Sequence, residues 1–403
     1  MPVIGLALLA LALKLAIAYS TIGTNDTLSF YGFAKELSQH RLEWTYQHSY
    51  YFNHPPLIAY YLQFIGYLSH QEIFHSCGVT FPFLLRLPGI VADFIVVLVL
   101  LRLSGRSPEF RVPTWALALF AISPVSLMVS GFHGNTDPVM VMFLVLAGYM
   151  CLRERPVLSG IFFALSCQIK VIPLLVLPII FFFWLARGAA RRFAVSFVLL
   201  SVIMWAQPLT KFPTLFLKNV LAYNSFWGLW GITYWLRLTQ LRVFSTVTFF
   251  NLPPAEFFVV NVLKLLIVIS VLTIAWRRRV LHGRALVDSI AYAWIIFFVF
   301  SPGVGVQYMV WLAPFVLVLS PSFYGWLTAA STVFLFFFYD ITANGFPWYI
   351  AISTKNLNTV WTPWSLWPWA VLIAGLFYLW RKAIAANPSL RLFSIETLRA
   401  EKI

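Results

Sequence analysis

Charged side chains are scarce in this sequence. Asp, Glu, Lys and Arg make up only 10% of its 403 residues, whereas 61% are hydrophobic and the mean hydropathy is +0.84. A soluble domain of this length could not bury so much apolar surface. The apolar residues form continuous runs near the length that crosses about 30 Å of hydrocarbon. Because transmembrane β-strands would give short alternating segments, the composition predicts an all-α polytopic membrane protein.

Cysteine is also rare, and several common motifs are missing. Cys77, Cys151 and Cys167 do not have the spacing of a metal site, so neither a zinc site nor a disulfide framework is expected. The sequence has no P-loop, no G-x-G-x-x-G after a strand and no DxD signature. We therefore expect no cofactor and no metal, and if the protein is an enzyme, we expect its donor not to be a cytosolic nucleotide.

The charge that is present is basic, with a net value of +15. Lys and Arg cluster in short loops between apolar runs, which is typical of cytoplasmic loops; attraction to anionic lipid is an alternative, and nucleic acid is not an expected partner. The runs predict about twelve transmembrane helices. Their expected positions are about 2–19, 82–101, 113–130, 138–152, 157–169, 172–186, 193–208, 257–275, 286–300, 307–320, 323–339 and 366–380.

The basic loops alternate with the other loops along the chain, so we expect them all on the cytoplasmic side, together with both termini. These loops are "RLSGRSPEFR", "RERP", "RGAARR", "WRRRVLHGR" and the tail from Arg381. The longest loops, about 20–80, 209–256 and 340–364, would then face the extracytoplasmic or luminal side of the plasma membrane or endoplasmic reticulum. The first segment lacks a basic n-region and a cleavage site, so we expect a retained helix. No internal repeat is seen, which favours one membrane domain over 1–403.

Two stretches of the first outer loop mix apolar and polar residues. Residues 27–42 place apolar side chains on one helical stripe, and 55–68 begin with Pro-Pro and are rich in tyrosine. Both stretches are typical of amphipathic helices that lie in the membrane interface. Such a surface suits an amphiphilic substrate, with its head in water and its tail in lipid.

Asp26 follows directly after the first apolar run and is the first acidic residue of the chain. One interpretation is structural, because Asp26 could cap a helix that starts at Thr27. The other is chemical, because a carboxylate at the membrane–water boundary can take a proton from a sugar hydroxyl. The two interpretations are compatible, and both stay open at this point.

Further polar residues are predicted at the same depth. In "GFHGNTDPVMV", Asp137 and Pro138 read as the cap and first residue of a helix, while His133, Asn135 and Asp137 would also form a polar cluster facing outward. In "FNHPPLIAY", His54 stands just before a rigid Pro-Pro turn. Each of these residues is either a local structural feature or part of a substrate site.

Lys170 ends a short apolar helix and is expected near the outer membrane surface. An ammonium there either snorkels to water or meets an anion such as a lipid phosphate. The stretch "SPGVGVQYMVWLAPF" breaks a helix at the same face and presents Gln307 and Tyr308. Broken helices are tolerated at membrane depth where they line a cavity.

Taken in order, these features resemble the GT-C superfamily of membrane glycosyltransferases, which use polyprenyl-phosphate sugars. The resemblance covers most of the chain and extends to the branch of GT87 (DUF2029) bacterial mannosyltransferases and GPI mannosyltransferases. It rests on Asp26 in the first outer loop and on four motifs. These are "NHPPL", "GFHGNTDP", "CQIKVIPLLVLP" and "SPGVGVQYMVWLAPF".

The resemblance implies a GT-C-like bundle and an inverting transfer of a hexose, most often mannose, to a lipid-linked or glycan acceptor outside the cytoplasm. It makes Asp26 the general base, with no second acidic neighbour to share a metal. Lys170, Gln307 and Tyr308 would lie near the donor phosphate, and His54, His133 and Asp137 would also bind substrate.

Two other classes remain open from the sequence. Twelve helices with both ends inside also fit a major-facilitator-like transporter or a lipid flippase, although the charges sit in outer loops rather than at mid-membrane. A lipid-linked glycan ligase would rely on outer basic residues. The second outer loop offers Lys211, Arg237 and Arg242.

Overall fold

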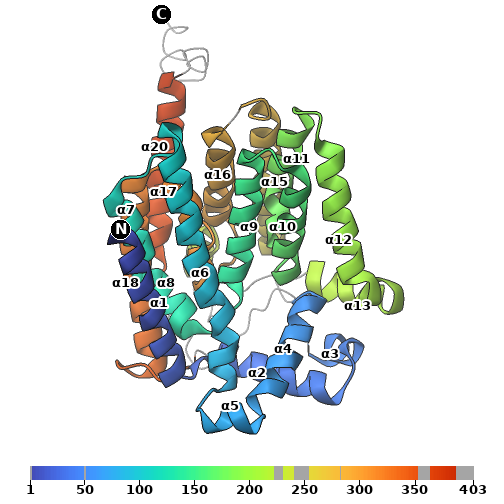
Figure 1. The fold of residues 1–403 in the computed structure, drawn as a ribbon. Helices are drawn as coiled ribbons and strands as arrows, with labels where there is room; N and C mark the ends of the chain where they lie inside the picture. The colour runs from blue at the N-terminus through green and yellow to red at the C-terminus, as the bar shows by residue number, and fades with distance from the viewer. Residues whose placement is uncertain are drawn as a thin grey trace, which may run out of the picture.

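The computed structural model describes residues 2–49, 51–221, 230–239, 254–281, 283–352 and 364–386. Figure 1 shows the long helices side by side in one bundle, with a layer of shorter helices across one end. The bundle consists of α1 (Pro2–Ser20), α6 (Phe81–Arg106), α7 (Thr114–Ala121), α8 (Pro124–Ser126), α9 (Asp137–Leu152), α10 (Pro156–Ile169), α11 (Leu177–Leu185), α12 (Ala190–Lys211), α15 (Pro254–Arg277), α16 (Arg284–Phe300), α17 (Ala313–Leu319), α18 (Pro321–Ala343) and α20 (Leu366–Ala386).

Within the described ranges, six helical segments are long and apolar enough to cross a membrane. One of them, 114–133, joins α7 and α8 to the π-helix η2 (Leu127–His133). The described residues also include five shorter apolar helices of 10–17 residues. The chain is therefore an all-α polytopic membrane protein, as the sequence predicts. The number twelve stays a prediction.

Two predicted helices are divided in the structure. The expected helix 172–186 consists of a 3-10 turn, η3 (Ile172–Val176), followed by α11, and 307–320 consists of η6 (Val306–Val310) followed by α17. Proline explains the positions of both breaks, since Pro178 and Pro314 lie in the first turns of α11 and α17. A proline has no backbone N–H and is tolerated only in the first turn of a helix.

The layer at one end of the bundle is formed mainly by α2 (Asn25–Gln39), α3 (Leu42–His48), α4 (Pro56–Ser69) and α5 (Glu72–Ser76). Helices α2 and α4 confirm the helices predicted at 27–42 and 55–68. The second long loop contributes α13 (Pro213–Phe216), η4 (Leu217–Leu221) and α14 (Gly231–Thr239), and η1 (Pro108–Phe110) follows α6. Arg242 and the side chain of Arg237 lie outside the described residues.

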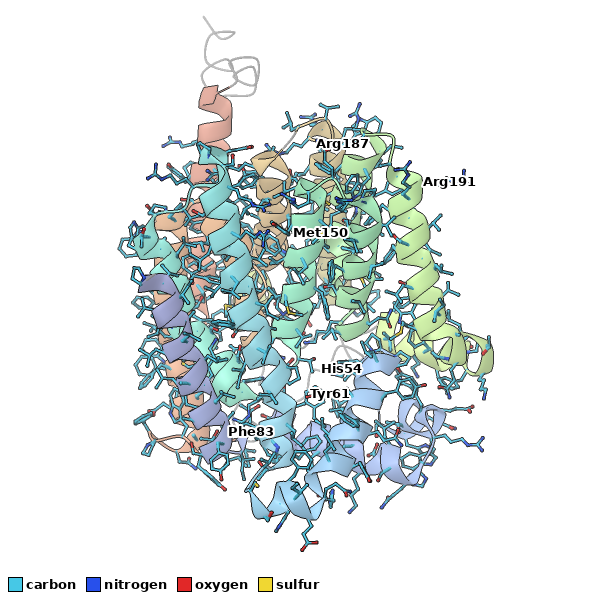
Figure 2. All side chains as sticks on the ribbon, in the orientation of Figure 1. His54, Tyr61, Phe83, Met150, Arg187 and Arg191 are labelled. Carbon is cyan, nitrogen blue, oxygen red and sulfur yellow. The ribbon has the colours of Figure 1, made fainter. Side chains whose placement is uncertain are left out.

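The basic loops and the helical layer lie at opposite ends of the molecule. Figure 2 shows Arg187 and Arg191, from the predicted cytoplasmic run "RGAARR", far from His54 and Tyr61, which lie where the bundle meets the layer. The separation matches the alternation of loops in the sequence. The candidate site residues described next belong to the end that carries the layer.

Charged side chains also lie inside the bundle. Lys14 of α1 contacts Asp93 of α6, with Nζ 2.6 Å from Oδ2, and donates to Ser126 Oγ of α8 at the same distance. A cavity of about 40 Å³ lies beside this pair. Because charges in hydrocarbon must be paired, this contact ties α1 to α6 and α8, the helices that lead into the candidate site.

Candidate active site

Asp26 lies in the first turn of α2, directly after the strand β1 (Gly23–Thr24). The residue that caps α2 is Thr24, whose Oγ1 accepts a hydrogen bond from the Asp26 N–H at 3.2 Å. The same hydroxyl donates to the carbonyl of His133 at 2.8 Å. The interpretation of Asp26 as the helix cap is therefore wrong, and its carboxylate is available for other partners.

Backbone contacts fix the segment that carries Asp26. Strand β1 pairs in parallel with β2 (Ile350–Ala351), which lies between α18 and α20. Gly23 and Gly134 both have positive φ, and a Cβ on Gly23 would stand 2.5 Å from the Phe132 carbonyl oxygen. Since only glycine permits this conformation and this close approach, β1 and the end of η2 are packed directly together.

Two side chains hold one oxygen of Asp26. His133 Nε2 lies 3.0 Å from Asp26 Oδ2, and Asn135 Nδ2 donates to the same oxygen at 3.2 Å. The carboxylate side chain keeps 31% of its surface exposed. Within the described residues, no hydrogen bond reaches Oδ1. One oxygen is thus fixed by protein, and the other remains open to a substrate hydroxyl.

The environment of Asp26 favours its ionised form. Burial raises the pKa of this carboxyl, but the hydrogen bond and charge of His133, the charge of Lys170 and the hydrogen bond of Asn135 together bring it below 3.8. Hydrogen bonds to the charged form of an acid lower its pKa in this way. Asp26 is therefore a carboxylate at neutral pH, as a general base requires.

His133 reaches a second partner on its other side. Its Nδ1 lies 2.9 Å from the hydroxyl of Tyr339, a fully buried residue of α18. Tyr339 is not among the residues predicted from the sequence, and it is 206 residues from His133. Its one available signal is a lone phenol close to the outer end of an apolar run, and many interfacial tyrosines share that feature.

His133 itself lies at the end of a helix and not in a loop. The predicted helix 113–130 continues to His133 through the π-helix η2, and the predicted loop 131–137 shortens to three residues before α9. A π-helix leaves carbonyl groups without their usual partners, and such turns are frequent at functional sites.

Arg86 satisfies the exposed carbonyl groups of this region. This buried residue of α6 donates to the carbonyls of Gly131 and Phe132 in η2, to that of Ala18 in α1 and to that of Thr21 just after α1. One guanidinium therefore joins the two segments that carry Asp26 and His133. Sequence reasoning missed Arg86 because it lies near the start of an apolar run, where a cation reads as a boundary marker.

A second acidic residue lies nearby but in a different setting. Asp137 is the first residue of α9, and its N–H donates to Asn135 Oδ1 at 3.1 Å, while Thr136 stands at the cap position. The cap is thus Thr136, one residue before the predicted cap Asp137, so that prediction is wrong by one position. Its side chain is fully buried, and Lys170 Nζ lies 2.6 Å from its Oδ1.

Lys170 is placed at the end of α10, as expected, but not in open solvent. Its ammonium lies 4.9 Å from the ring centre of Tyr308 and 5.5 Å from that of Trp311. These two rings stack with centroids 3.7 Å apart. Both the ion pair and the aromatic faces stabilise the cation. Gln307, beside Tyr308 in η6, is partly buried.

The charges of both Lys170 and Asp26 act on His54. Burial, with a smaller contribution from the charge of Lys170, lowers the pKa of this imidazole to about 3, although a hydrogen bond to the Ile169 backbone and the charge of Asp26 oppose the shift. In the described structure, its Nδ1 has no hydrogen-bond partner. His54 is therefore a neutral, buried histidine with a free nitrogen at neutral pH.

The structure thus brings the predicted residues together in two groups: Asp26 with His133, and Asp137 with Lys170 and Tyr308. Comparison with protein families adds to this picture. The model of glycosyltransferase family 87 matches residues 52–302.

The chain belongs to glycosyltransferase family 87. It is therefore a membrane glycosyltransferase, and the resemblance stated from the sequence is confirmed. The matched range includes His54, Arg86, His133, Asp137 and Lys170, but not Asp26 or Tyr339. A search of curated proteins found no match.

Proposed function

We propose that the protein transfers a hexose, most readily mannose, from a polyprenyl-phosphate donor to a lipid-linked or glycan acceptor on the extracytoplasmic face. One observation carries this proposal. Asp26 is an ionised carboxylate with Oδ2 held by His133 and Asn135 and with Oδ1 free of protein hydrogen bonds among the described residues. A base needs one such oriented oxygen within reach of the acceptor.

In the proposed reaction, Asp26 Oδ1 takes the proton of the acceptor hydroxyl while that oxygen forms a bond to the anomeric carbon. The bond between this carbon and the phosphate oxygen breaks, and polyprenyl phosphate leaves with the electron pair. Because attack and departure occur on opposite faces, the configuration inverts. Asp26 then returns its proton to solvent, to which its carboxyl is partly open.

The leaving phosphate gains charge during transfer and needs positive partners. Lys170 is the proposed cation, since its charge already acts on the pKa of both Asp26 and His54. Its present partner is Asp137, so donor phosphate must compete with this carboxylate or share the ammonium with it. Fixed charges at the site of developing charge are a main source of catalysis.

The helical layer supports an amphiphilic donor or acceptor. Tyr60, Phe64 and Tyr67 of α4 are exposed, and α4 contains no charged residue. Aromatic side chains of this kind favour the membrane interface. A layer of such helices beside Asp26 would admit a sugar headgroup from water while its lipid tail stays in hydrocarbon.

The test is an assay of purified protein with a panel of polyprenyl-phosphate hexoses and glycan or glycolipid acceptors. Mass spectrometry would follow the release of polyprenyl phosphate and the new glycoside. Nucleotide sugars with the same hexoses form the matched control panel. We expect turnover with a polyprenyl-phosphate donor and none with the nucleotide sugars. Turnover with nucleotide sugars alone would overturn the proposed donor class.

A further inference from the structure

A continuous chain of polar groups runs from the bundle interior to the proposed base. The Tyr339 hydroxyl lies 2.9 Å from His133 Nδ1, and His133 Nε2 lies 3.0 Å from Asp26 Oδ2. Tyr339 and His133 are buried, whereas Asp26 is partly exposed. The chain therefore has one end fixed in protein and one end open to substrate.

The chemistry of the partners limits where the protons lie. An ionised carboxylate only accepts hydrogen bonds, so His133 must carry a hydrogen on Nε2. This leaves a neutral ring whose Nδ1 accepts from Tyr339, or a charged ring whose Nδ1 donates to Tyr339. In the second case the phenol O–H needs another acceptor, and the described residues offer it none. A buried O–H without a partner is costly, so the neutral ring is favoured.

The ring of Tyr339 is held in place by its neighbours. Its centroid lies 5.3 Å from that of Phe132 and 5.4 Å from that of Trp348. Trp348 is itself fixed by a hydrogen bond from Nε1 to Asp340 Oδ1 at 3.3 Å. The hydroxyl of Tyr339 therefore has a constrained position next to His133 Nδ1.

We propose that Tyr339 is a positioning residue for the base. It holds His133 as the neutral ring with hydrogen on Nε2, so that His133 donates permanently to Asp26 Oδ2. This inference rests on the proposed role of Asp26. It follows that Oδ1 alone receives the acceptor proton and that His133 takes up no second proton during transfer.

Other charged groups act on the same ring and must be considered with it. Asp26 of α2 is in direct contact with the ring, 3.0 Å from Nε2. The groups that approach from the packed elements are Asp26, His54, Arg86, Lys170, Tyr339 and Asp340. Because both signs are present, the hydroxyl of Tyr339 is the group that selects one protonation state.

The first test reads the protonation state of His133 without any turnover. Nitrogen-15 NMR of histidine-labelled protein in lipid, assigned with His133→Gln, should show hydrogen on Nε2 and none on Nδ1 in the native protein. Tyr339→Phe should produce a mixture of states. Tyr324→Phe, at a second buried tyrosine of α18, should leave the signal unchanged. A doubly protonated His133 in the native protein would overturn the inference.

The second test uses amides that imitate one ring nitrogen each. Gln at position 133 places its N–H near the Nε2 position and its carbonyl toward Tyr339, whereas Asn places its N–H near Nδ1. We expect His133→Gln to keep turnover within about tenfold of the native value and His133→Asn to lose far more. Equal, large losses in both would show that His133 must take up a second proton during transfer, which would overturn the inference.

Turnover of Tyr339→Phe completes the test. We expect kcat to fall about tenfold with little change in KM, because the lost interaction orients the base rather than binding substrate. Unchanged kcat with a normal His133 signal would refute the positioning role. Absence of donor consumption by the native protein would instead refute the proposed function, and the NMR result would stand apart from it.

Discussion

Asp26 and Asp137 are the same residue type in nearly the same position of two helices, yet they are prepared for different tasks. Each lies in the first turn of its helix, and Asn135 contacts both, donating to Asp26 Oδ2 and accepting from the Asp137 N–H. Asp26 is held by His133 and Asn135 and is 31% exposed, whereas Asp137 is fully buried against Lys170. A carboxylate with an exposed oxygen can reach a substrate, whereas a buried carboxylate in contact with an ammonium is occupied by that ion pair.

The largest expected effect is a difference in the free energy of unfolding between the Asp→Asn variants at the two positions. Asp137→Asn leaves Lys170 partly buried without its counterion, and such losses cost about 3–5 kcal/mol. Asp26→Asn removes no ion pair with a permanent cation and should cost about 1 kcal/mol. Thermal unfolding in detergent measures both. Equal losses would mean that the two carboxylates are held in the same way.

The second-largest expected effect is a pH-dependent loss of stability caused by His54, on which the charges of both Lys170 and Asp26 act. Its folded pKa of about 3 lies below the ordinary value of 6.5. The unfolded state thus binds the proton more readily, so stability falls as pH drops from 6.5 toward 3, by an amount on the order of a few kcal/mol.

The check is unfolding at several pH values for the native protein and for His54→Gln. The variant should lose less stability over this window. His75→Gln, at an exposed histidine of α5, should follow the native curve. If the His54 and His75 variants behave alike, His54 is not a buried neutral imidazole.

A smaller effect concerns the ion pair itself. Replacing both partners, Asp137→Asn with Lys170→Gln, removes the uncompensated charge and should recover about 2 kcal/mol relative to Asp137→Asn alone. The double variant should nevertheless bind donor weakly, because the proposed cation for its phosphate is gone. A double variant that is no more stable than Asp137→Asn would show that the pair is not coupled.

The smallest expected effect is a shift in the acidic pH at which kcat/KM drops. Since the pKa of Asp26 lies below 3.8, kcat/KM should stay level as pH falls and drop only near the folded pKa. His133→Leu removes a hydrogen bond to the charged form, which raises the pKa of Asp26 and moves this drop to higher pH. A limit that stays in place would contradict the contact between His133 and Asp26.

Sequence reasoning found residues that are unusual where they stand. They are ionisable groups at the ends of apolar runs, so hydropathy and the alternation of basic loops were enough to predict that they lie at one end: Asp26, His133, Asp137 and Lys170. The same signals predicted the helical fold and the two amphipathic helices of the first outer loop.

The partners of those residues could not be found in this way. Tyr339 meets His133 across 206 residues, and Arg86 bonds to carbonyl groups whose exposure depends on the π-helix η2. Helix caps at Thr24 and Thr136 also differ by one or two positions from the expected ones, because tertiary contacts decide them. A single sequence carries no signal for contacts between residues so far apart along the chain.

The central claim is that the free oxygen of Asp26 is the base, and one measurement on Asp26→Asn tests it most directly. Donor binding and turnover should be measured on the same preparation, with Glu72→Gln, at an exposed acid of α5, as the control. We predict unchanged donor affinity with turnover reduced by about a hundredfold or more in Asp26→Asn alone. Native turnover in this variant would contradict the account.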